Sequence, residues 1–169
     1  MFSKANANQL RGNLESMKFL PGGGGESSFE LGAAVSHNYT AYKQHYGLNF
    51  SKLDMDLKSA RSTIGTFSSG PYELVCQHFL PSLQPPRKTA FLLHGYFDHA
   101  GLYRHLIEHL LKRDIAVIIF DLPGHGLSSG TTASISSFHE YSSAFVECLT
   151  LAKQQQVASP WIAIGQSTG

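Results

Sequence analysis

The second half of the chain alternates short, continuous apolar runs with amphipathic stretches. The apolar runs cover residues 89–95, 115–121 and 160–165, and their composition is typical of strands buried on both faces. Residues 101–114 and 137–152, which separate these runs, have the spacing of helices with one apolar side. This order predicts right-handed crossover connections and a mostly parallel sheet with helices on both faces, which is an α/β fold.

Each predicted helix has an apolar side that we expect to face the core. The first helix groups six such residues: Leu102, Tyr103, Leu106, Ile107, Leu110 and Leu111. Ser137 and Glu140 are spaced as a capping box at the start of the second helix. Its predicted buried stripe contains Phe138, Tyr141, Phe145, Cys148 or Leu149, and Ala152.

Residues 1–60 form a predicted N-terminal extension, which we expect to be partly flexible because of the glycine run Gly22–Gly25. Within the extension, residues 35–50 mix aromatic and polar side chains at near-helical spacing. We assign residues 61–169 to the α/β domain. This domain begins with two β-rich segments that predict a hairpin, residues 62–67 and 72–80.

The composition is that of a globular chain with few charges. The chain has 42% apolar and 15% charged residues and a net charge of +1, and its scattered basic residues exclude nucleic acid as a partner. Cys76 and Cys148 lack metal-binding spacing, so we expect reduced packing residues. No stretch approaches the roughly 20 apolar residues of a membrane span, and no secretory signal is recognisable. We therefore expect a cytoplasmic protein without stable membrane insertion.

The third apolar run leads directly into the sequence Gly-Gln-Ser-Thr-Gly, residues 165–169. A Gly-x-Ser-x-Gly pattern after a buried strand is typical of the strained turn that exposes a serine nucleophile. Gly165 and Gly169 leave room where such a turn is too tight for side chains. Five residues can match by chance, and the preceding strand is what favours Ser167 as a nucleophile.

An acyl-transfer serine needs N–H donors aimed at the oxygen that becomes negatively charged. The backbone N–H of Thr168, directly after the serine, is one candidate. The backbone N–H of Tyr96 is the other, because it follows His94 and Gly95 at the end of the first apolar run. His94 and Gly95 support this site, or alternatively form only a turn that ends the strand. We expect Asp121, the last residue of the second run, to anchor the loop that follows by hydrogen bonds.

Three motifs in this order resemble those of monoacylglycerol lipases and bacterial lysophospholipases, which belong to the α/β-hydrolase superfamily. The sequence HGYFDHAGLY, residues 94–103, resembles their HGxxxHSGxY pattern, and FDLPGHGLSSG, residues 120–130, is similar to D-x-x-GHG-x-S-x-G. The final GQSTG is similar to GHSMG and departs from it at Gln166 and Thr168. The resemblance covers about residues 70–169.

The resemblance implies a specific fold and activity. Members have an eight-stranded, mostly parallel sheet and hydrolyse lipid-like monoacyl esters, such as monoacylglycerols or lysophospholipids, through an acyl-enzyme, with no metal or organic cofactor. A small-molecule or lipid-like ester is therefore the expected partner. The triad order in this fold is serine, acid, histidine. Because Ser167 is third from the end, we expect the triad partners to follow residue 169, and the 169-residue chain alone to be inactive.

Other functions stay open. A thioesterase, an acyltransferase or a proline-type aminopeptidase uses the same serine turn, and a non-catalytic binding protein can share the fold. His105, Glu108 and His109 match the zinc pattern H-x-x-E-H. They share the polar face of a predicted helix with Lys112, which explains their positions without a metal.

Overall fold

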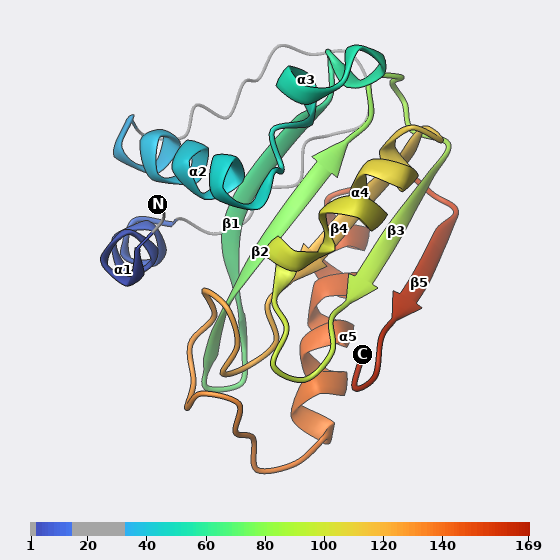
Figure 1. The fold of residues 1–169 in the computed structure, drawn as a ribbon. Coiled ribbons are helices and arrows are strands. Elements are labelled where there is room, and N and C mark those ends of the chain that lie inside the picture. Colours follow the sequence, from blue (N-terminus) through green and yellow to red (C-terminus); the bar gives the residue numbers. More distant parts are fainter. Residues whose placement is uncertain (1–2, 15–32) are drawn as a thin grey trace.

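The computed structural model describes residues 3–14 and 33–169, so the run Gly22–Gly25 lies outside the described residues. Five strands form one mixed sheet in the order β1-β2-β4-β3-β5 (Figure 1). The strands are β1 (Arg61–Ser69), β2 (Tyr72–Leu80), β3 (Lys88–Leu93), β4 (Ile115–Phe120) and β5 (Trp161–Gly165). β4, β3 and β5 are parallel, whereas β1 and β2 form an antiparallel hairpin that joins the sheet at β4. The α/β fold expected from the sequence is confirmed.

Helices cover both faces of this sheet. Figure 1 shows α2 and α4 on one face and α5 on the other. The helices are α1 (Lys4–Gly12), α2 (Ala33–Tyr46), α3 (Phe50–Leu53), η1 (Met55–Leu57), η2 (Ala100–Tyr103), α4 (Arg104–Leu111) and α5 (His139–Gln154). Val117 and Ile118, adjacent in β4, belong to two different apolar clusters because successive strand residues point to opposite faces. No helix among the described residues is long and apolar enough to cross a membrane.

The structure corrects the predicted packing at the start of both helices. Leu102 is 56% exposed, because it lies in the 3-10 turn η2 that precedes α4. Phe138 is 68% exposed, because it is the residue before α5 and does not share the buried side of that helix. The Glu140 carboxylate accepts a hydrogen bond from the Tyr72 hydroxyl at 2.6 Å and does not close the predicted capping box. Helical spacing therefore does not predict which side chains are buried among the residues that precede a helix.

The prediction that β5 is buried on both faces is also wrong. β5 is the edge strand of the sheet in the described part of the chain, with β3 as its only neighbour. Ala163 and Gly165 are exposed, while Ile162 and Ile164 are half-buried. An apolar run alone does not distinguish a central strand from an edge strand, because both pack apolar side chains against helices.

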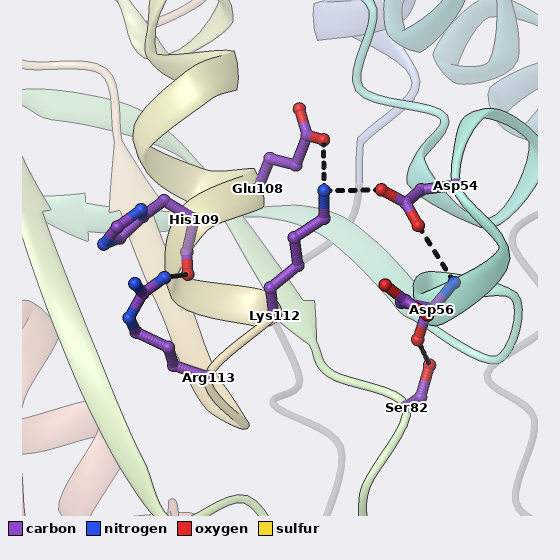
Figure 2. A network of polar contacts seen from close by, with 7 residues as sticks. All are labelled: Asp54, Asp56, Ser82, Glu108, His109, Lys112 and Arg113. Carbon is purple, nitrogen blue, oxygen red and sulfur yellow. Dashed lines mark hydrogen bonds and ion pairs between the residues drawn. The ribbon is translucent and has the colours of Figure 1, made fainter.

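An ion-pair network lies at the end of α4. Lys112 Nζ lies 2.6 Å from Asp54 Oδ2 and 3.1 Å from Glu108 Oε1, as Figure 2 shows. These contacts tie the end of α4 to the segment between α3 and η1. Glu108, from the H-x-x-E-H pattern, therefore belongs to this network and points to Lys112, as its predicted place on the polar face implies.

Buried His78 makes the free energy of unfolding depend on pH. His78 lies in β2 and is 2% exposed, and burial lowers its pKa from 6.5 to about 4. Between these values the unfolded chain binds a proton that the folded chain does not, so stability falls as the pH drops from 6.5 towards 4. At pH 5 the free energy of unfolding is therefore about 2 kcal/mol lower than at pH 7.

We expect urea titrations to show that the free energy of unfolding of the wild type falls between pH 7 and pH 5. In His78→Phe this fall should be smaller by about 2 kcal/mol. The phenylalanine keeps a ring of similar size in β2 and has no proton to bind. Equal pH dependence in the two proteins would contradict the assignment to His78.

Candidate active site

The loops that follow β3 and β5 lie side by side. Leu93 at the end of β3 pairs with Gly165 at the end of β5, and Gln166 N–H donates to the Leu93 carbonyl at 3.1 Å. A Cβ atom on Gly95 would collide with Gln166 Oε1, the end of a flexible side chain, so the two loops touch at this point. Two predicted motifs that are distant in the sequence therefore meet at one edge of the sheet.

Ser167 has a left-handed backbone conformation, with φ of 57°. Serine rarely adopts positive φ, and it does so where the surrounding turn dictates the backbone. A hydrogen bond of 3.0 Å from Gly169 N–H to the Gln166 carbonyl closes this turn. A Cβ atom on Gly165 would collide with the main chain of Gly169, which explains the glycine at 165. Ser167 itself is exposed at the tip of the turn.

Tyr96 and Thr168 bring two main-chain N–H groups to the same region. In the part of the chain that the structure describes, no hydrogen bond uses either N–H. Both residues line the same cavity, and Thr168 directly follows Ser167. Two free donors on neighbouring loops can stabilise an oxygen on which negative charge develops.

His94 joins the loop after β3 to the loop after β4. It is fully buried, its Nδ1–H donates to the Gly95 carbonyl at 2.8 Å, and its Nε2 accepts from Leu122 N–H at 2.9 Å. Burial lowers the pKa of His94, which agrees with the neutral ring that these bonds require. Both ring nitrogens are occupied, so His94 is a positioning residue and is not available as a base for Ser167.

Asp121 anchors the loop after β4, as the sequence predicts. Its buried carboxylate accepts from Ala100 N–H at 2.7 Å and from Leu127 N–H at 2.8 Å. Its own carbonyl accepts from the Ser128 hydroxyl at 2.5 Å. Gly126, with φ of 51°, lies so close to the carboxylate that a Cβ atom would collide with it. The carboxylate therefore holds η2 and the loop after β4 together.

Tyr103 is a site residue that the sequence assigned to the core. Its hydroxyl lies 2.9 Å from Gln166 Oε1 and 3.2 Å from Asp98 Oδ2, and it accepts from Gly95 N–H at 3.1 Å. It thus ties the residue before Ser167 to the loop after β3. Tyr103 is the last residue of the motif at 94–103, and its place in that motif could have indicated this role from the sequence.

A cavity of about 440 Å³ lies beside Thr168 and Tyr96. It is lined by Tyr96, Ala133, Ser134, Ile135, Phe138, Tyr141 and Thr168. The Tyr96 hydroxyl donates to the Ala133 carbonyl at 2.6 Å and so fastens the loop after β3 to the cavity wall. Sequence reasoning missed this cavity because most of its wall comes from the irregular segment before α5, which carries no recognisable motif.

Asp121→Asn tests the anchoring role of the buried carboxylate. Asparagine keeps the shape but replaces one acceptor oxygen with an NH₂ group, so a buried main-chain N–H loses its partner. We expect the free energy of unfolding to fall by roughly 1–3 kcal/mol in denaturant titrations. Asp114→Asn is the matched control, because Asp114 forms only a half-exposed pair with Arg87, and we expect a change within roughly 0.5 kcal/mol. Equal losses in both variants would refute the anchoring role.

Comparison with known proteins gives consistent matches over the same region. Residues 84–169 match the family model described as serine aminopeptidase, S33. The chain is 28% identical over 113 residues to a monoacylglycerol lipase of Mycolicibacterium smegmatis, covering 67% of this chain and 40% of that protein. It is 28% identical over 102 residues to human monoglyceride lipase, covering 60% of this chain and 33% of that protein. The chain therefore spans well under half the length of these relatives.

Solved structures show the same fold. An esterase of Pyrococcus furiosus superposes with a TM-score of 0.56 at 23% identity, covering 68% of this chain and 45% of that one. A thermostable carboxyl esterase of Bacillus coagulans gives a TM-score of 0.55 at 20% identity, covering 64% of this chain and 37% of that one. These likenesses establish the architecture around the candidate site.

Proposed function

Because the chain belongs to the serine aminopeptidase S33 family and has the α/β-hydrolase fold, we propose that it carries the nucleophile of a carboxylic-ester hydrolase. The nucleophile is Ser167. The observation that carries the proposal is the backbone of Ser167, which has positive φ on a turn that requires glycine directly after β5. A strained serine at a sheet edge where ligands bind is the arrangement that acyl transfer uses.

The two free N–H groups define where the ester carbonyl sits. In the proposed reaction, Ser167 Oγ attacks the carbonyl carbon, and the carbonyl oxygen becomes an oxyanion that accepts from Tyr96 N–H and Thr168 N–H. The serine proton passes to a base and then to the departing alcohol. Water afterwards cleaves the acyl-enzyme and regenerates the serine. His94 takes no part as the base, because both its nitrogens are bonded elsewhere.

A lipid-like monoacyl ester is the substrate class that we favour. The relatives include proteins named monoacylglycerol lipase and monoglyceride lipase, and the cavity beside the candidate oxyanion site is walled largely by apolar side chains such as Ile135 and Phe138. The family description favours an aminopeptidase as the second candidate. The cytoplasmic location expected from the sequence stays a prediction.

Labelling with a fluorophosphonate probe tests the nucleophile. We expect mass spectrometry of the full-length protein to find one adduct, on the peptide that contains Ser167, and Ser167→Ala to remove it. Hydrolysis of p-nitrophenyl butyrate should fall by roughly 10³-fold or more in the same variant. Ser134→Ala, which changes a serine on the cavity wall, is the control and should retain the adduct.

Two outcomes separate the alternatives. An unlabelled Ser167 in a folded protein would indicate a non-catalytic binding protein. Faster cleavage of proline p-nitroanilide than of the butyrate ester would favour the aminopeptidase.

A further inference from the structure

The main-chain N–H of Tyr96 lies on a strained turn. The turn spans residues 95–98 and is closed by a hydrogen bond of 3.1 Å from Asp98 N–H to the Gly95 carbonyl. Tyr96 and Phe97 are its central residues, and Phe97 has φ of 64°. Positive φ at the second central position of a turn favours glycine. A phenylalanine adopts it only where the surrounding structure dictates the backbone.

The two central residues have few contacts that could impose this backbone. Phe97 is 74% exposed and Tyr96 is 45% exposed, so burial in the core does not fix them. Among the described residues, the main-chain N–H and carbonyl groups of Tyr96 and Phe97 make no hydrogen bond. Within this part of the chain, their one hydrogen bond comes from the Tyr96 hydroxyl, which donates to the Ala133 carbonyl at 2.6 Å.

The acceptor of this bond is itself held in place. Ala133 N–H donates to the Gly124 carbonyl at 3.0 Å, and Gly124 N–H donates to the Ser129 carbonyl at 2.8 Å. A Cβ atom on Gly124 would collide with the Thr131 carbonyl, so the segment before α5 lies tightly against the loop after β4. The Tyr96 hydroxyl therefore ties the turn after β3 to a fixed point on another loop.

We propose that the Tyr96 hydroxyl is a brace: its bond to Ala133 holds the strained turn and so positions the main-chain N–H of Tyr96 for the oxyanion. The hydroxyl touches no reacting atom, so its role is positioning. The inference rests on the proposed function, because the oxyanion is that of the ester attacked by Ser167. Without the hydroxyl, Phe97 relaxes to negative φ in part of the molecules, and a donor whose direction varies stabilises the oxyanion less well.

Tyr96→Phe removes the hydroxyl and keeps the ring, which contacts the rings of Phe97 and His125. For hydrolysis of p-nitrophenyl butyrate by the full-length protein, we expect kcat to fall about fivefold and KM to stay within about twofold, because the alignment matters in the transition state. Tyr72→Phe is the matched control, since the Tyr72 hydroxyl donates an equally short bond of 2.6 Å to Glu140. Its kcat should equal that of the wild type.

A second substitution tests whether strain at Phe97 makes the brace necessary. Glycine adopts positive φ without strain, so Tyr96→Phe/Phe97→Gly should recover kcat to within about twofold of the wild type. Tyr96→Phe/Phe97→Ala is its control: alanine also removes the exposed ring but keeps the Cβ atom that disfavours positive φ, so kcat should stay low. A hydroxyl that only stabilised the fold would not produce this difference between glycine and alanine.

Hydrogen exchange of the Asp98 main-chain N–H, followed by NMR, reports on the turn without any substrate. This N–H closes the turn, so we expect it to exchange about fivefold faster in Tyr96→Phe than in the wild type. The exchange should slow again in Tyr96→Phe/Phe97→Gly.

Three results would overturn the brace: wild-type kcat in Tyr96→Phe, wild-type exchange of the Asp98 N–H in that variant, or recovery with alanine as complete as with glycine. Failure of the proposed function is recognised separately. In that case Ser167 stays unlabelled by the fluorophosphonate probe, whereas the exchange of the Asp98 N–H still shows whether the hydroxyl holds the turn.

Discussion

The candidate site depends on one buried carboxylate. The carboxyl ends of β3, β4 and β5 lie at the same edge of the sheet, so the loops that leave them are close but not held by the sheet itself. Asp121 accepts main-chain N–H groups from η2 and from its own loop, and His94 adds a second link at Leu122. These bonds fix the loop after β3 relative to the loop after β4, and the Tyr103 hydroxyl ties the loop after β3 to Gln166, next to Ser167.

Several buried polar groups lie within this small region. Those around Asp121 are mutually paired, and a paired network fixes a single loop arrangement.

The sequence predicted the parts of the molecule that follow simple periods or fixed motifs. Continuous apolar runs located β3 and β4, and the Gly-x-Ser-x-Gly spacing located the turn after β5. The two glycines of this turn leave no room for a Cβ atom. The apolar run of residues 160–165 did not by itself reveal the edge position of β5, because such a run does not report how many neighbours a strand has. Phe138 and Leu102 were misplaced because helical periodicity was extended into residues that precede the helices.

The other features that the sequence did not predict depend on tertiary contacts. The bond between Tyr103 and Gln166 joins residues separated by 63 positions, and no local pattern encodes it. The unpaired hydroxyl of Tyr141 is likewise a property of the folded surroundings, because the sequence marks Tyr141 only as one apolar position in a helix. The turn that carries Ser167 was therefore predictable from the sequence, whereas the contacts that hold this turn in place required coordinates.

A crystal structure of the protein after reaction with a phosphonate ester would test most directly whether Ser167 is the nucleophile and whether Tyr96 and Thr168 bind the oxyanion. We expect a bond from Ser167 Oγ to phosphorus, and a phosphonyl oxygen about 2.7–3.1 Å from both the Tyr96 and Thr168 main-chain nitrogens. Phosphorus bonded to another residue, or a phosphonyl oxygen directed away from both nitrogens, would contradict it.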